Sequence, residues 1–165
     1  MKMIVAVSEN WGIGKNNNLL FSIPEDMKFF RTTTADSVVI MGRKTLESFP
    51  GKKPLKNRIN IVLTKDAAYE TEAIVCTSKD EVMKALEKIE NKNVFVIGGE
   101  SIYRLFEPEC DTAYVTKVKA LTDADTFFMN LDESTDWVLS EQTDEKEDNG
   151  YKFSFCTYIR EEKNK

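Results

Sequence analysis

The chain has 165 residues, of which 41% are hydrophobic and 31% are charged, so it suits one domain with a proper hydrophobic core. It contains no histidine, which excludes Ser-His-Asp and Cys-His nucleophilic systems and histidine metal sites. The net charge of −5 argues against a nucleic-acid-binding protein, and no apolar run approaches the roughly 20 residues of a membrane span. Any acid–base chemistry must therefore use Asp, Glu, Lys, Tyr or Cys.

The N-terminal segment and the cysteines favour a cytoplasmic protein. Residues 1–10 hold a short apolar run without a small-residue cleavage site, which indicates a first strand rather than a signal peptide. Cys76, Cys110 and Cys156 are odd in number and far apart, a pattern typical of reduced thiols rather than of a disulfide framework or a zinc site. We therefore expect a cytoplasmic monomer without a metal site.

Strand and helix patterns alternate along the first half of the chain. The periodicity predicts an apolar strand, a loop rich in glycine and asparagine, a helix, a second strand, a short helix and a third strand. These elements cover residues 3–8, 9–21, 24–33, 37–42, 44–49 and 59–64, in that order.

The second half continues the alternation and ends in a long hairpin that turns near Asn149-Gly150. Its strands are predicted at residues 73–77, 94–99, 112–120, 137–143 and 151–160, and its helices at 79–90 and 100–106. Strands that alternate with helices indicate an α/β fold, with a mostly parallel central β-sheet covered by helices on both faces. We expect a single domain over residues 1–165, with the hairpin as an antiparallel C-terminal edge.

Two adjacent carboxylates, Glu25 and Asp26, lie at the start of the helix at 24–33. Ser22 and Glu25 have the spacing of a capping box, so Glu25 is predicted to be a cap and a surface charge. At about 100° per residue, Asp26 lies beside the stripe that we expect to be buried. That stripe consists of Ile23, Met27, Phe30 and Thr34. A carboxylate there needs a partner, which a neighbouring loop or a ligand with paired N–H donors could provide.

Two junctions share one pattern, in which a strand ends at glycine and a helix follows. The first runs from Gly42 into Arg43 and Lys44, and the second from Gly98-Gly99 into Ser101. The glycines could serve tight turns alone, but a helix start after glycine also suits a phosphate. Residues 42–65 hold seven basic residues against one acid, a local charge of +6 that favours an anion, whereas the acidic segment 132–150 is interpreted as a solvated face.

Several longer motifs recur in the order found in one family. They are GIGKNNNLLFSIPEDMKFF, VIMGRKTLESF, NRINIVLTK, VFVIGGESIYRLF, YVTKV and DTFF. From end to end, the chain resembles the bacterial dihydrofolate reductases. The resemblance implies a dihydrofolate reductase-like fold and NADPH-dependent reduction of 7,8-dihydrofolate to 5,6,7,8-tetrahydrofolate for thymidylate and purine synthesis. It also implies that antifolate inhibitors bind the same site.

The resemblance implies that Asp26 is catalytic and pairs with the pterin, that Thr116 supports it, and that Arg58 holds the substrate's α-carboxylate. The implied substrate-binding residues are Val5, Ala6, Leu19, Asp26, Met27, Phe30, Arg31, Phe49, Lys53, Leu55, Arg58, Ile97, Tyr103 and Thr116.

For the cofactor, the family pattern implies diphosphate contacts at both glycine junctions, a cis Gly98-Gly99 bond and a mobile lid at 9–21. Arg43, Thr64 and Lys65 are placed by it at the adenosine 2′-phosphate. The implied cofactor-binding residues are Ala6, Ile13, Gly14, Lys15, Asn18, Leu19, Gly42, Arg43, Lys44, Thr45, Leu63, Thr64, Lys65, Ile97, Gly98, Gly99, Glu100, Ser101, Ile102 and Tyr103.

The sequence departs from the family at three places. Leu20-Phe21 replaces a frequent Pro-Trp pair, which removes an indole N–H that would organise water near the carboxylate. Lys44 replaces a frequent histidine, and Ser101 stands where some members have arginine. None of these changes removes a required group.

Two alternatives remain open at this stage. A pterin reductase of the related deaminase–reductase class shares the strand–glycine–helix pattern, but has no need of the PEDMKFF helix together with Arg58. A non-catalytic nucleotide-binding module would keep the glycines and have no use for Asp26. A fusion with thymidylate synthase is not expected at this length.

Overall fold

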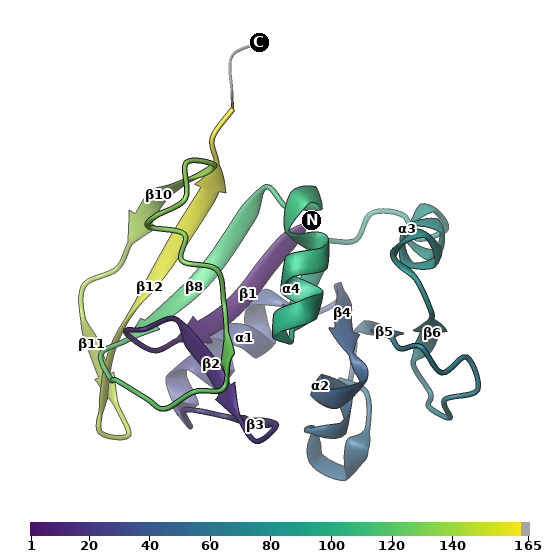
Figure 1. Ribbon diagram of the computed structural model, residues 1–165, viewed down its shortest axis with the longest axis horizontal. Coiled ribbons are helices and arrows are strands. Elements are labelled where there is room, and N and C mark those ends of the chain that lie inside the picture. The colour runs from purple at the N-terminus through teal and green to yellow at the C-terminus, as the bar shows by residue number, and fades with distance from the viewer. Residues whose placement is uncertain (163–165) are drawn as a thin grey trace.

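The computed structural model describes residues 1–162, and a twisted central sheet forms its frame (Figure 1). Eight strands follow one another across the sheet in the order β10-β12-β8-β1-β7-β4-β5-β6, and β11 pairs with β12. Their bounds are β1 (Lys2–Val7), β4 (Val38–Gly42), β5 (Ile59–Leu63), β6 (Ile74–Cys76), β7 (Val94–Gly98), β8 (Thr112–Val118), β10 (Trp137–Gln142), β11 (Lys146–Asp148) and β12 (Tyr151–Arg160).

The strand directions confirm the predicted α/β class. Strands β8, β1, β7, β4, β5 and β6 run parallel to one another, whereas β12 is antiparallel to both β8 and β10. Each strand predicted for this sheet is present within two residues of its expected bounds. The antiparallel hairpin therefore forms one edge of the sheet, as the sequence predicted.

Helices cover both faces of the sheet, with α1 behind it and α4 in front of it in Figure 1. The helices are α1 (Pro24–Thr33), α2 (Arg43–Glu47), α3 (Lys79–Glu87) and α4 (Glu100–Phe106), with short 3-10 turns η1 (Pro50–Lys52) and η2 (Glu107–Glu109). Successive strand residues point to opposite faces. Met3 packs with Phe106 of α4, while Ile4 packs in the cluster that contains Phe29 of α1. The sheet thus separates two apolar cores. No helix within residues 1–162 is long and apolar enough to cross a membrane.

The predicted loop at 9–21 contains a hairpin, so that prediction was wrong. Strands β2 (Gly12–Lys15) and β3 (Asn18–Leu19) pair with each other, and β2 also pairs with β9 (Thr126–Phe127). These strands are short and rich in glycine and asparagine, which hides them from a periodicity search. Gly12 is required there because a Cβ at this position would lie 2.5 Å from the Cβ of Ala124.

The capping box predicted for α1 does not form. Ile23 is the N-cap residue and has no side-chain cap bond. The backbone N–H of Glu25 instead donates to Oδ2 of Asp148 at 2.8 Å, and Asn149 Nδ2 donates to the carbonyl of Ser22 at 2.7 Å. A distant hairpin therefore supplies the acceptor that local spacing assigned to Ser22.

The buried stripe predicted for α1 is only partly buried. Ile23 and Thr34 are buried, whereas Phe30 is half-buried and the side chain of Met27 is 56% exposed. The middle of the helix therefore borders open space rather than the core, which is where a ligand can reach it.

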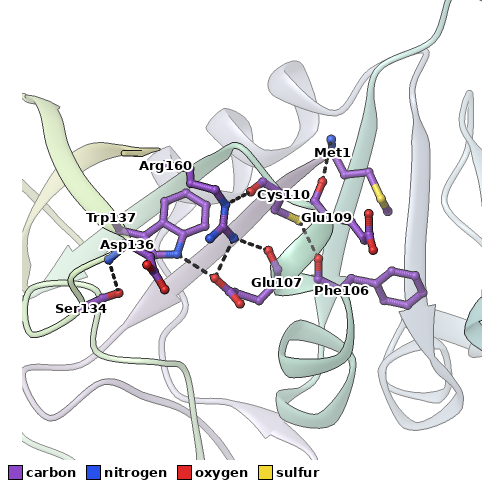
Figure 2. Close-up of polar contacts among 9 residues, drawn as sticks. All are labelled: Met1, Phe106, Glu107, Glu109, Cys110, Ser134, Asp136, Trp137 and Arg160. Carbon is purple, nitrogen blue, oxygen red and sulfur yellow. Dashed lines mark hydrogen bonds and ion pairs between the residues drawn. The ribbon is translucent and has the colours of Figure 1, made fainter. Parts of the chain in front are cut away.

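The far end of the sheet is fastened by Arg160 of β12 (Figure 2). Its Nε donates to the carbonyl of Cys110 at 2.8 Å, and its Nη2 lies 2.7 Å from Oε1 of Glu107. Trp137 donates its indole N–H to the same oxygen at 2.9 Å, and the guanidinium lies 4.6 Å from the centre of the Trp137 ring. Hydrogen bonds, an ion pair and ring contact thus join β10, β12 and η2.

Candidate active site

Asp26 lies in the first turn of α1 and faces β8. The hydroxyl of Thr116, itself buried, donates to Oδ1 of Asp26 at 2.6 Å. Burial raises the pKa of Asp26 above its ordinary value of 3.8, and the bond from Thr116 opposes part of that rise. The neighbouring Glu25 points away and lies 3.5 Å from the ammonium of Lys146. The two adjacent carboxylates therefore have different environments, because Asp26 is bonded to β8 of the sheet and Glu25 pairs with Lys146 of β11.

Several of the predicted substrate-binding residues belong to one apolar cluster. Ile97 of β7, Phe30, Phe49 and Leu55 all pack against the cluster that contains Ile4. Ala6 is the register partner of Thr116 on β1, and Val5 packs into the core on the other face of the sheet. Met27 is exposed.

Arg58 lies just before β5 and is held by the end of α1. Its Nε donates to Oγ1 of Thr34 at 3.0 Å, its Nη1 to the carbonyl of Lys56 at 3.0 Å, and its Nη2 to the carbonyl of Arg31 at 3.3 Å. The guanidinium lies 5.9 Å from the centre of the Phe30 ring. Desolvation lowers the pKa of Arg58, and the charge of Arg31 lowers it further.

Sequence reasoning missed two residues that position Arg58. Thr34 accepts from the guanidinium, and Asn60 closes the preceding loop by bonding both the N–H and the carbonyl of Leu55, at 3.0 and 2.9 Å. Both side chains are buried. A signal for Asn60 was present, because an amide within the otherwise apolar strand INIVL needs buried partners.

The two glycine junctions are neighbours in the structure. Strands β4 and β7 run parallel and Met41 pairs with Gly98, so both strands end at the same edge. A Cβ at Gly98 would lie 3.4 Å from Oγ1 of Thr45, and one at Gly42 would lie 3.1 Å from the Ile102 side chain. Gly98 also has a φ of +133°, which other residues rarely adopt, and its bond to Gly99 is cis.

Basic side chains adjoin the first junction. Gly42 pairs with Leu63 at the end of β5, so Arg43 and Thr64 each directly follow the paired ends of two neighbouring strands. Nε of Arg43 lies 3.9 Å from Oε1 of Glu47, and its side chain is 46% exposed. Lys44 and Ser101 are exposed at the starts of α2 and α4. The arrangement is open to a negatively charged group.

Other predicted residues already have protein partners. Tyr103 is buried and donates its hydroxyl to the carbonyl of Ile4 at 2.7 Å, and burial raises its pKa. Glu100 accepts the N–H of Phe127 at 2.6 Å, which fastens β9 to α4. Tyr103 therefore ties α4 to β1 near Gly98, and Glu100 ties α4 to β9 of the three-stranded sheet.

The residues predicted in the lid lie on the β2–β3 hairpin. Gly14 accepts the N–H of Asp125 at 3.0 Å, and Lys15 pairs with Asp123. Ile13 is half-buried against the core, while Asn18 is exposed and Leu19 is 81% exposed. In this structure Leu19 projects into solvent and is not packed against the cleft.

The fold and the site define a class of protein. It is an α/β protein in which a half-buried carboxylate on α1 is bonded to the sheet, and a half-buried guanidinium just before β5 is bonded to the end of α1. Two adjoining strand–glycine–helix corners provide a place where a phosphate-bearing cofactor can approach the backbone closely.

Comparison with known proteins identifies the family. The family model for dihydrofolate reductase matches residues 1–160. Dihydrofolate reductases of Aedes albopictus and Drosophila melanogaster are 33% and 35% identical to the chain, over 94% and 93% of it and 95% and 93% of their own lengths. A solved dihydrofolate reductase from Enterococcus faecalis, complexed with NADP(H) and RAB-propyl, has a TM-score of 0.86 at 32% identity, over 98% of this chain and 96% of that one. The chain belongs to the dihydrofolate reductase family.

Some relatives are longer. Bifunctional dihydrofolate reductase-thymidylate synthase 1 of Arabidopsis thaliana is 38% identical over 96% of this chain. The chain spans about a third of the length of that protein and of the other bifunctional relatives. The family resemblance seen in the sequence is therefore confirmed.

Proposed function

We propose that this chain reduces 7,8-dihydrofolate to 5,6,7,8-tetrahydrofolate with NADPH, for one-carbon metabolism in thymidylate and purine synthesis. The observation that carries the proposal is the environment of Asp26. A half-buried carboxylate with a raised pKa, fixed by Thr116, is suited to bind a nitrogen heterocycle and to favour its protonated form.

The glycine corners fit the cofactor, because side chains at Gly42 and Gly98 would meet Ile102 and Thr45. NADPH supplies the hydride when bound. Its diphosphate would lie along the two corners, with Thr45 between them. Arg43, Thr64 and Lys65 would engage the 2′-phosphate, which gives the chain a preference for NADPH over NADH. The remaining predicted cofactor contacts stay part of this proposal.

Asp26 would pair with N3 and the 2-amino group of the pterin, as two parallel donor–acceptor contacts allow. Reduction at C6 requires a proton at N5, and Asp26 is the acid in this cleft that can favour the protonated ring. Because it lies at the far edge of the pterin, it would act through water or ring tautomers. Thr116 keeps the carboxylate oriented, and Ile97 and Phe30 keep bulk solvent away.

The opposite end of the substrate carries a glutamate. Arg58 would grip its α-carboxylate with two parallel hydrogen bonds, and Thr34 and the carbonyl of Arg31 hold the guanidinium in place. Phe49 and Leu55 would contact the aminobenzoyl ring between the two charged ends. Antifolates that carry a similar amidine-like edge would compete for Asp26.

The proposal includes the state of the protein in the cell. We place it in the cytoplasm as a monomer, with a single domain over residues 1–165 and with small molecules rather than nucleic acid or membrane as its ligands.

The test is NADPH oxidation with dihydrofolate, followed by the loss of NADPH absorbance. The unmodified protein should turn over, and Asp26→Asn should keep the fold and NADPH binding but lose turnover by orders of magnitude at neutral pH. A folded protein that binds NADPH and does not oxidise it with dihydrofolate would instead be a nucleotide-binding module.

A further inference from the structure

A cavity lies where α1 meets the hairpin edge of the sheet, and its lining shares no residue with the predicted substrate and cofactor sites. Helix α1 provides Phe29, β8 provides Tyr114, and β12 provides Phe155 and Thr157. In Figure 1, α1 lies behind the sheet, and β12 and β10 continue the sheet beyond β8 to its edge. The cavity has a volume of about 600 Å³. Small-molecule sites typically have volumes of about 300–1,000 Å³.

Three aromatic rings form the apolar wall of this cavity. Phe29 stacks on Phe155, with ring centroids 4.5 Å apart and an angle of 27° between the planes. Phe29 also meets Tyr114 edge-on, with the centroids 6.3 Å apart. All three side chains are only partly buried, so each ring keeps a surface that a ligand can contact. Such a wall favours a planar aromatic group, which can stack on one ring and meet another edge-on.

The polar side of the cavity belongs to the edge strand β10. Glu141 and Gln142 line the cavity at the end of this strand, and Glu141 is the register partner of Thr157. The pairing of β10 with β12 shifts between Leu139 and Glu141. A bulge of this kind bends a strand and re-aims its side chains. The carboxylate of Glu141 thus lies across the cavity from the aromatic wall.

Glu141 is the charge that a ligand in this cavity would meet. Its side chain is exposed, and within residues 1–162 it forms no ion pair. The nearby acid Glu145 differs, because it pairs with Lys119. On the β1 side, the ammonium of Lys2 lies 5.9 Å from the centre of the Tyr114 ring. A cationic group on a ligand therefore has its counter-ion at Glu141, and its ring belongs on the side of Tyr114.

We propose that this cavity is a second ligand site, which binds a small planar aromatic molecule that carries one cationic nitrogen. The ring packs against Phe29, Tyr114 and Phe155, and the nitrogen donates to the carboxylate of Glu141. Asp26 does not line this cavity, so the carboxylates of Asp26 and Glu141 belong to separate sites.

The experiment titrates isotope-labelled protein with tryptamine and, separately, with indole-3-propionate, which have the same ring and spacer and carry opposite charges. Backbone amide signals in NMR spectra report where each probe binds. Tryptamine should shift the signals of Tyr114, Phe155 and Thr157 with a dissociation constant of about 1 mM. Indole-3-propionate should bind there roughly tenfold more weakly, because Glu141 repels its carboxylate. Equal binding of the two probes, or no shift of these signals by tryptamine, would overturn the proposal.

Three variants test the counter-ion and the shape of the cavity. Glu141→Gln should weaken tryptamine binding about threefold to fivefold. Glu147→Gln removes the same charge from an exposed position on β11 that does not line the cavity, so an equal loss there would contradict the site. Thr157→Phe fills the cavity without changing the charge and should abolish the tryptamine-dependent shift of Tyr114, with the fold checked by the remaining amide signals. Unaltered binding in that variant would also contradict the site.

Asp26→Asn separates this cavity from the candidate active site, where an aromatic cation could also bind. It should leave the tryptamine titration of Tyr114, Phe155 and Thr157 unchanged. Weaker binding in Asp26→Asn together with unaltered binding in Glu141→Gln would assign the probe to the active site and overturn the second site. These measurements follow binding and not turnover, so their failure leaves the proposed function standing.

Discussion

Arg58 and Arg160 are two partly buried arginines with opposite surroundings. Arg160 meets the carboxylate of Glu107 at 2.7 Å and the ring of Trp137 at 4.6 Å, and Figure 2 shows these partners on both sides of it. Among residues 1–162, Arg58 bonds to the hydroxyl of Thr34 and to two carbonyls, and the charge of Arg31 lowers its pKa. The protein neutralises the guanidinium of Arg160, whereas that of Arg58 is open to the ligand that we propose.

Asp26 belongs with Arg58 in this comparison. Oδ1 of Asp26 accepts a hydrogen bond from the neutral hydroxyl of Thr116, and burial raises the pKa of the carboxyl group. The folded state therefore binds this proton more tightly than the unfolded chain, so the contribution of Asp26 to the free energy of unfolding falls as the pH rises from 3.8 through the raised pKa. Above that pKa Asp26 costs stability, as we expect for the catalytic role that we propose, whereas Arg160 stabilises the structure.

The largest effect that tests this distinction comes from Arg58→Leu. Loss of a charge-assisted contact of about 1.5–3 kcal/mol should raise the dissociation constant for dihydrofolate roughly 10- to 150-fold. Binding of a pterin without glutamate should stay nearly unchanged. An equal loss for both ligands, measured by titration, would make Arg58 structural.

Arg160→Leu should show the reverse behaviour. It leaves Glu107 and the carbonyl of Cys110 without their donor, which should lower the free energy of unfolding by about 1.5–3 kcal/mol. Urea unfolding measures this loss, and KM for dihydrofolate at a permissive temperature should not move. If Arg160→Leu kept its stability but bound dihydrofolate more weakly, the contrast between Arg160 and Arg58 would be wrong.

The basic residues that we propose at the cofactor, like Arg58, should affect ligand binding when they are replaced. Arg43→Ala combined with Lys65→Ala should reduce the preference for NADPH over NADH by about tenfold, since the side chain of Arg43 is 46% exposed and solvent weakens its contact. The ratio of kcat/KM for the two cofactors measures the preference. If the unmodified protein already uses both equally, the 2′-phosphate assignment is wrong.

The smallest expected effect concerns the start of α1. Asp148→Ala removes the acceptor for the N–H of Glu25 and should cost about 1 kcal/mol of stability. Glu25→Gln is the matched control, because Glu25 makes only a half-exposed pair with Lys146, and it should cost no more than about 0.5 kcal/mol. If Glu25→Gln lowered the urea midpoint more than Asp148→Ala, the predicted capping box of Ser22 and Glu25 would be supported instead.

Much of the fold followed from the sequence because its signals are local. The alternating apolar strands and the glycine junctions predicted the parallel sheet, and helical periodicity placed Asp26 beside the expected buried stripe. The cap of α1 did not follow, because Asp148 lies 123 residues from Glu25 in the chain and no local pattern connects them. The same limit hid the β2–β9 pairing, which depends on a close approach at Gly12.

For the candidate site too, some features followed from the sequence and others did not. Motif order named Asp26, Thr116 and Arg58, and the structure brings Asp26 and Thr116 to 2.6 Å. What the sequence could not show is which polar groups are already engaged. Glu100 and Tyr103 have protein partners, whereas the lysines at 52–56 have no ion-pair partner within residues 1–162. Pairing of charges depends on tertiary contacts, so it was visible only in the structure.

The most direct test of the account is the pH dependence of hydride transfer in a single turnover, for the unmodified protein, Asp26→Asn and Glu25→Gln. Burial favours the protonated carboxyl, so the unmodified rate should fall as the pH rises through one ionisation above 3.8. Glu25→Gln should keep that profile. Asp26→Asn should lose the ionisation and be slow by orders of magnitude, recovering only at acidic pH where the pterin protonates itself. An Asp26→Asn enzyme that retains the ionisation and the rate at neutral pH would contradict the central claim.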